Sequence, residues 1–197
     1  MDLPIHRAFN TLYEMLVDRD MPEDAALMKQ DIYGPDELTS MYRREKTMVT
    51  IPLKTVNIVL YTQVHLVLKD FRSAFTAFKE ANKSYIIVMH EKPNQGLMKE
   101  LKDTEAKLSL PFANLFTYKQ LLFNPTRHQL VPKHSKLNPT EVKLLLETNS
   151  VKNRYSLPWI QHSDPIAQYL GLKAGDVVKI LRDSVTACEY ESYRCCV

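Results

Sequence analysis

Glycine is scarce in this chain, with four residues among 197. Loops that hold nucleotides use several closely spaced glycines, because the backbone must approach the phosphates. Gly171 and Gly175 are four residues apart, but a phosphate-binding loop needs a strand before it and a Lys-Ser/Thr pair after its last glycine. Here a short apolar helix precedes Gly171, and a valine-rich strand over 177–181 follows Gly175. We therefore predict that both glycines form turns and that the chain has no dinucleotide-binding fingerprint.

Cysteines are few, and long apolar runs are missing. Three cysteines (188, 195 and 196) lie in the last ten residues, a pattern that gives no disulfide framework and favours a reducing compartment. They also lack the paired spacing of zinc ligands, so we expect no metal and no cofactor. No stretch of about 18 uncharged apolar residues occurs, and the first 20 residues mix acids and bases. We expect neither a membrane span nor a signal peptide.

Neither sign of charge dominates. Residues 1–123 contain 16 basic and 16 acidic residues, and residues 124–197 contain 10 and 7. A free-standing nucleic-acid-binding protein usually concentrates its basic residues in one patch, and no single element of this sequence does so.

The first 123 residues predict an α/β domain. Apolar residues recur at helical spacing over 7–19, Pro22 begins a second helical stretch through Lys29, and Asp36 is a plausible N-cap for a third helix through Arg43. The remaining elements alternate, which is typical of an α/β layer. We predict strands over 48–53, 56–61, 85–90 and within 112–123, and helices over 68–78 and 98–107.

A second domain, over 124–197, is predicted to be small and of the α+β class. Asn138, Pro139 and Glu141 form an N-cap, a first helical position and a capping box, and Asp164 with Pro165 repeats the cap-plus-proline start. The alternating tail is expected to pair with the strand at 177–181.

Catalytic patterns are weak. No Gly-x-Ser-x-Gly motif occurs, and no cysteine stands beside a plausible base. Asp36, Glu105 and Lys107 match the letters of a magnesium-dependent nuclease, but the last two fall on a predicted helix and Asp36 lies far away in sequence. We expect no catalytic residues, and the nuclease remains the alternative from the enzyme class.

Three segments carry a resemblance to a known family. They are RHQLVPKH (127–134), LPWIQHSDPIAQYLGLKAGDVVKILR (157–182) and YESYR (190–194). In order and spacing they resemble the fifth-largest subunit shared by eukaryotic nuclear RNA polymerases, whose archaeal counterpart corresponds to the C-terminal part alone. The first helix, RAFNTLYEMLVDR, resembles the family's opening helix more weakly.

The resemblance implies a non-catalytic polymerase subunit with two domains, located in the nucleus, or in the nucleolus if it is dedicated to the ribosomal-RNA polymerase. An N-terminal jaw domain (1–123) of inactive, nuclease-like topology would lie near downstream duplex DNA, with Lys92 and Lys99 as DNA-proximal candidates. A C-terminal assembly domain (124–197) would pack on the largest subunit, among other polymerase subunits, and no small-molecule substrate or membrane is implied. The family motif residues carried over are His128, Leu130, Pro132, Lys133, His134, Asp164, Pro165, Tyr169, Gly171, Gly175, Val178, Arg182, Tyr190, Tyr193 and Arg194.

The chain departs from the family pattern at two places. In the turn after Arg182, this chain has Val185 where the family has an acidic residue, Glu189 where it has a basic one, and Cys188 at a position that is flexible in the family. In the segment 94–99, only Met98 and Lys99 of the family's loop motif are present. These departures lead to the hypothesis of a paralogue specialised for one polymerase. A free-standing interaction module that uses the assembly domain is a further alternative.

Overall fold

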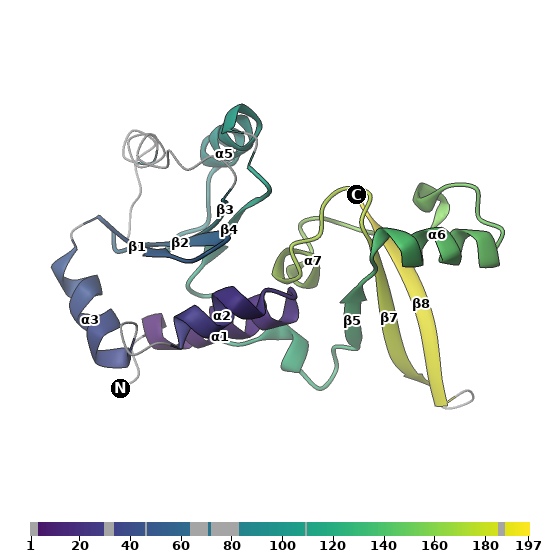
Figure 1. Ribbon diagram of the computed structural model, residues 1–197, viewed down its shortest axis with the longest axis horizontal. Helices are drawn as coiled ribbons and strands as arrows, with labels where there is room; N and C mark the ends of the chain where they lie inside the picture. Colours follow the sequence, from purple (N-terminus) through teal and green to yellow (C-terminus); the bar gives the residue numbers. More distant parts are fainter. Residues whose placement is uncertain are drawn as a thin grey trace. The chain divides into compact units, whose positions relative to one another are not determined.

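The computed structural model describes residues 4–29, 34–45, 47–63, 71, 83–108, 110–184 and 188–197. The chain divides into two compact units, residues 1–123 and 124–197, which are described in turn (Figure 1). None of the helices in these described ranges is both long and apolar enough to cross a membrane.

The N-terminal unit is built on a four-stranded sheet of order β1–β2–β3–β4. β1 is antiparallel to β2, whereas β2, β3 and β4 are mutually parallel. β2 and β3 are buried along their whole length, as expected for central parallel strands with continuous apolar sequences. The strand bounds are Met48–Pro52, Val56–Tyr61, Ser84–Met89 and Ala113–Thr117.

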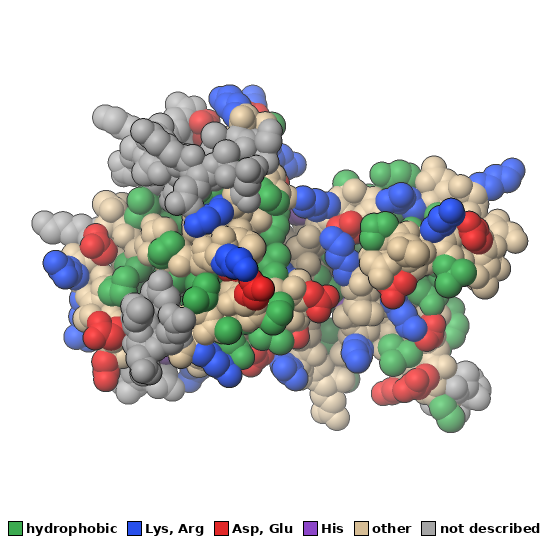
Figure 2. Space-filling model, viewed as in Figure 1, with side chains coloured by type: hydrophobic (Ala, Val, Ile, Leu, Met, Phe, Trp, Pro, Cys, Tyr) green, Lys and Arg blue, Asp and Glu red, His purple; other side chains and the backbone are tan. Residues whose placement is uncertain are grey.

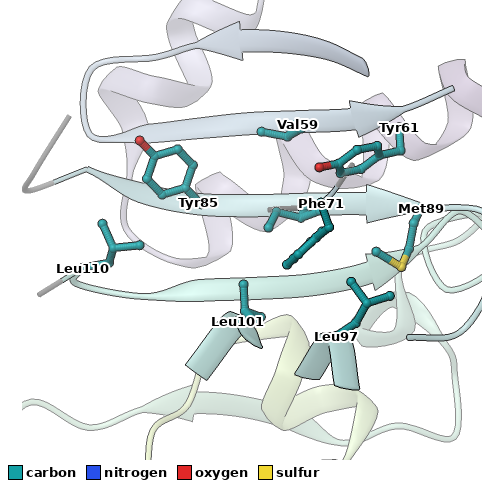
Figure 3. Packing of buried hydrophobic residues seen from close by; sticks show 9 residues of the cluster. Val59, Tyr61, Phe71, Tyr85, Met89, Leu97, Leu101 and Leu110 are labelled. Atoms are coloured by element: carbon teal, nitrogen blue, oxygen red, sulfur yellow. The ribbon is translucent and has the colours of Figure 1, made fainter. Parts of the chain in front are cut away.

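Helices cover both faces of this sheet (Figure 1). α5 packs Leu97 and Leu101 against alternate residues of β2 and β3, among them Tyr61 and Tyr85, and Phe71 joins this cluster (Figure 3). α1 and α2 lie on the opposite side of the sheet in Figure 1, and the amphipathic pattern of α1 explains its fully buried apolar stripe. The helix bounds are α1 Pro4–Asp18, α2 Pro22–Met28, α3 Pro35–Arg44 and α5 Gln95–Leu108.

One predicted feature of this unit is corrected and another is confirmed in part. α3 begins at Pro35 with Gly34 as its N-cap, so Asp36 belongs to the first helical turn rather than capping it. The strand predicted within 112–123 ends at Thr117, where the Gln120 side chain accepts a hydrogen bond from the Thr117 amide at 2.8 Å and the chain turns. The helix predicted over 68–78 lies outside the described residues except for Phe71, which is helical and buried.

The C-terminal unit is a second four-stranded sheet, of order β5–β7–β8–β6. The predicted pairing of the tail with the 177–181 strand is confirmed: β7 (Val177–Ser184) and β8 (Cys188–Cys196) form an antiparallel ribbon. β5 (Lys133–Lys136) and β6 (Trp159–Ile160) were not predicted, because one is entirely polar and the other has only two residues. Both are strands by virtue of their partners, since β5 pairs with β7 and β6 pairs with β8.

The two α-helices of the C-terminal unit start as the sequence predicts. In α6 (Pro139–Thr148) the Asn138 side chain and Glu141 form a reciprocal capping box, with both hydrogen bonds at 2.8 Å. In α7 (Pro165–Tyr169) the Asp164 carboxylate accepts from the amide of Ile166 at 2.8 Å. Single-turn 3-10 helices, η2 (Pro125–Arg127) and η3 (Arg154–Ser156), complete the unit.

Candidate functional site

The motif residues of the C-terminal unit differ in burial: some are buried, some are exposed, and others, among them His134 and Arg194, are partly buried. Tyr169 and Val178 are buried to 1% and 0% exposure, so they contribute to the core of the unit. Leu130, by contrast, is 84% exposed, and Tyr190 is 58% exposed. The buried members hold the fold, and the exposed members are the ones available to a partner.

Gly171 and Gly175 occupy left-handed backbone conformations, with φ of 64° and 88°. Gly171 follows the last turn of α7, and the amide of Leu172 donates back to the Ala167 carbonyl at 2.9 Å, which ends the helix. Gly175 donates its amide to the Cys196 carbonyl at 2.9 Å and accepts from Arg154 at 3.1 Å. The prediction that these glycines form turns is confirmed.

Replacing Gly175 by alanine will destabilise the C-terminal unit by about 1–3 kcal/mol, because a Cβ is strained at this positive φ. The new methyl would also lie 3.1 Å from the Tyr155 hydroxyl. Urea unfolding followed by fluorescence of Trp159, the single tryptophan, reports on this unit. Gly96→Ala, at an unstrained helical position of the other unit, is the control; equal stability of Gly175→Ala and wild type would contradict the assignment.

Pro132, His134 and Asp164 come together beside the sheet. The His134 ring is half-buried, and its Nδ1 lies 2.6 Å from the Pro132 carbonyl oxygen. Because a carbonyl only accepts, Nδ1 carries the proton and the neutral ring leaves Nε2 as an acceptor. Burial lowers the pKa of His134; the Pro132 hydrogen bond and the Asp164 charge oppose this shift, and Arg182 and Arg194 add to it.

The unfolding free energy of the C-terminal unit will fall with decreasing pH because of His134. Its folded pKa lies below its unfolded value of about 6.5, so the unfolded state binds the proton first. The contribution of neutral His134 to the unfolding free energy is complete above about pH 6.5 and is lost as the pH falls toward the folded pKa. Urea midpoints by Trp159 fluorescence between pH 5 and 7.5 will show this slope, and His134→Gln will reduce it. If His134→Gln shows the same slope as wild type, another group causes the pH dependence of stability.

The register of β7 and β8 sorts their exposed residues by charge. Arg182 lies opposite Tyr190, and Val178 lies opposite Arg194, all on the face that carries His134. We call His134, Arg182, Tyr190 and Arg194 the basic face. On the reverse face of the ribbon, Asp183 lies opposite Glu189, and Glu191 pairs with Lys179 and accepts from Tyr193.

That reverse face borders a groove of about 790 Å³ between the sheet and α6. Its lining includes Lys133, Leu144, Leu181 and Tyr193, so the groove contains both apolar and charged side chains. Leu144 is 64% exposed. The motif residues Tyr193 and Lys133 therefore lie on the side of the sheet next to α6, opposite to the basic face.

Exposed aromatic residues near β6 were missed by the sequence analysis. Trp159 is 62% exposed, and its indole donates to the Tyr155 carbonyl at 2.9 Å. Arg194 donates to the Trp159 carbonyl at 3.0 Å, which fixes the arginine beside the tryptophan. A lone tryptophan in an irregular segment gave no periodic signal from which this surface could have been predicted.

His128 is exposed and stabilises its own loop: its Nδ1 accepts a hydrogen bond from the Leu130 amide at 3.2 Å.

The nuclease residues of the N-terminal unit do not lie together. Asp36 is in the first turn of α3, which contacts β1, whereas Glu105 and Lys107 are near the end of α5, which contacts β4. β1 and β4 are the opposite edges of the sheet. Among the residues that the structure describes, no group of three or more His, Cys, Asp or Glu side chains could hold a metal ion. The arrangement gives magnesium chemistry no site built from these three residues.

Lys92 and Lys99 are both exposed in the N-terminal unit. Lys92 follows β3 in the loop that leads to α5, and Lys99 is in the second turn of that helix. The loop ends at Asn94, whose side chain accepts from the Leu97 amide at 2.8 Å and so closes the start of the helix. Both lysines are placed near the carboxyl end of the parallel strand β3.

Comparison with known proteins identifies the C-terminal unit. Residues 123–196 match the family described as "RNA polymerase Rpb5, C-terminal domain". A Dictyostelium discoideum protein, subunit rpabc1 of DNA-directed RNA polymerases I, II and III, is 51% identical over 82 residues, which are 42% of this chain and 41% of that protein. The corresponding Caenorhabditis briggsae subunit is 44% identical over 79 residues, or 40% and 37%. The match thus spans about two fifths of each relative's length, and over that region the resemblance to the fifth-largest polymerase subunit is confirmed.

Proposed function

We propose that this chain, whose residues 123–196 form an Rpb5 C-terminal domain, is a non-catalytic structural subunit of a multisubunit DNA-directed RNA polymerase. The observation that carries the proposal is the 51% identity, over 82 residues, to a protein named as a subunit of three RNA polymerases. Nucleotide addition would be the work of other subunits. The chain would work in the nucleus, and in the nucleolus if it serves the ribosomal-RNA polymerase.

The C-terminal unit would anchor the chain to the largest polymerase subunit. Residues such as Tyr169 and Val178 form its apolar core, whereas Leu130, Trp159, and Arg182 and Tyr190 of the basic face are exposed. Tryptophan, tyrosine and arginine are the side chains enriched in the energetically dominant part of protein interfaces. A permanent complex also needs a sizeable and partly apolar contact, which such residues supply.

The N-terminal unit would act as a jaw that braces incoming duplex DNA. Lys92 and Lys99 would contribute phosphate contacts, which position DNA without reading its sequence. The same proposal gives this unit a nuclease-like topology, with which the parallel strands β2, β3 and β4 are compatible. The nuclease alternative is not favoured, because Asp36 and Glu105 belong to helices at opposite edges of the sheet.

A tagged copy of the full chain purified from nuclear extract at high salt tests the proposal. Large polymerase subunits, identified by mass spectrometry, should remain bound in stoichiometric amounts. Recovery of one polymerase would support a specialised paralogue, and recovery of several would support a shared subunit. A cellular pool largely free of polymerase would overturn the proposal and leave a free-standing interaction module.

A further inference from the structure

We propose that the basic face (His134, Arg182, Tyr190 and Arg194) binds an acidic segment of a partner polypeptide. The inference rests on the proposed function, since the partner is taken to be another polymerase subunit. It goes beyond that function by naming the face and the chemistry that this face recognises.

The basic face lies along β7 and β8 beyond the buried part of the same side of the sheet. Val178 and Ile180 are buried on this side, at 0% and 1% exposure. Two residues further along β7, Arg182 is exposed, and its cross-strand neighbour Tyr190 is 58% exposed. The ribbon therefore continues beyond the buried part of this side and presents the side chains of Arg182 and Tyr190 to solvent.

The two strands of the ribbon contribute only basic charge to this face. The described side chains that β7 and β8 place here include two arginines and no carboxylate. The nearby acid, Asp164, uses Oδ1 to accept from two amides of α7, at 2.8 and 3.4 Å. The reverse face carries Asp183, Glu189 and Glu191 instead, and Figure 2 shows acidic side chains beside the ribbon tip at the lower right. Period-two alternation thus places all three of these carboxylates on the reverse face, together with Lys179, and none on the basic face.

Arginine suits a carboxylate partner on geometric grounds. The planar guanidinium presents a fork of N–H donors that matches a carboxylate with two parallel hydrogen bonds. One Arg194 nitrogen donates to the Trp159 carbonyl at 3.0 Å, which orients the group while its other N–H groups remain donors. Tyr190, opposite Arg182, adds a large exposed ring of the kind enriched at interfaces.

His134 suits a polypeptide better than a phosphate backbone. Its Nδ1–H is directed at the Pro132 carbonyl, so Nε2 of the neutral ring is an acceptor on this face. A phosphodiester offers acceptors alone and leaves such a nitrogen without a donor. A polypeptide supplies both groups that the face needs: backbone N–H donors for His134 and Asp or Glu carboxylates for the arginines.

The first experiment replaces Tyr190 by the photocrosslinking residue benzoylphenylalanine in the full chain, within polymerase purified through that chain. Irradiation should join it to a peptide of another subunit in which Asp and Glu outnumber Lys and Arg. The same residue at Glu189, the adjacent position on the reverse face, is the control and should yield a different peptide. A crosslink from position 190 to nucleic acid, to a neutral or basic peptide, or to nothing would overturn the proposal.

Charge reversal is the second experiment. Arg182→Glu should weaken retention of the chain in polymerase at high salt by about tenfold, as for a charged contact desolvated in an interface. Asp183→Lys, one residue away on the reverse face, should leave retention within about twofold, as for a rim charge. Both positions are exposed, so folding is preserved and Trp159 fluorescence verifies it.

The outcomes separate this inference from the proposed function. If the wild-type chain is retained and Arg182→Glu is retained equally well, the basic face is not the contact, while the polymerase function stands. If the wild-type chain itself fails to copurify with polymerase, both proposals fall together.

Discussion

Replacing Tyr169 by alanine will destabilise the C-terminal unit by about 3–5 kcal/mol, the range for truncating a buried aromatic side chain. Tyr169 is 1% exposed at the end of α7, and it ranks among the largest fully buried side chains of the described residues. A unit of this size has a total stability of about 4–11 kcal/mol. The substitution therefore removes a large part of this stability, and under the proposed function it should also weaken retention of the chain in polymerase.

Urea unfolding followed by Trp159 fluorescence measures this effect. Tyr169→Phe keeps the ring and should cost much less, while Tyr190→Ala, which truncates an exposed tyrosine of the same unit, should stay within about 1 kcal/mol of wild type. If Tyr169→Ala and Tyr190→Ala cost the same, the division of the motif into buried and exposed residues is wrong.

Deleting residues 195–197 will abolish cooperative unfolding of the C-terminal unit. Cys195 and Cys196 are fully buried, and the three residues make backbone hydrogen bonds that join the end of β8 to β6, to the loop after it and to the turn before β7. The bonds link Cys195 to Pro158, Cys196 to Gly175 and Asp176, and Val197 to Ile160 and His162, at 2.8 to 3.0 Å. Five bonds at about 1 kcal/mol each, together with two buried thiols, approach the total stability of the unit.

The control is Cys195→Ala combined with Cys196→Ala, which keeps the backbone and removes only the side chains. This double variant should retain a sigmoidal, though shifted, urea transition by Trp159 fluorescence, whereas the deletion should give a gradual one. A cooperative transition in the deletion variant would show that the segment is peripheral to the fold.

Short-range sequence signals predicted the local starts and stops well. Asn138 and Asp164 cap their helices as expected, because a capping side chain bonds to amides two or three residues away and needs no distant partner. Gly171 and Gly175 adopt positive φ for a reason that is also local, since glycine has no Cβ to clash in this conformation. At α3 the local signal failed, since Gly34 and Pro35 together started the helix one residue before the expected cap.

Strands that depend on their neighbours could not be predicted from short segments of the sequence. β5 consists of four polar or charged residues, and β6 of two residues, so neither has a usable hydrophobic period. They become strands because β7 and β8 offer backbone partners on either side. The segment after Thr117 shows the reverse case: apolar residues predicted a strand, but the Thr117 amide donates a hydrogen bond to the Gln120 side chain and the chain turns.

The sequence by itself was enough to predict the family that the C-terminal unit resembles, its helix caps, its glycine turns and the pairing of its tail with the strand at 177–181. These depend on residue type and short spacing, and the motifs were sufficient to indicate the polymerase-subunit family that the comparison confirmed over residues 123–196. The tertiary structure decided which motif residues are buried and which are exposed. It also placed Arg182, Tyr190 and Arg194 with His134 on one face, because strand register, which joins residues distant in sequence, sets what lies side by side on a sheet.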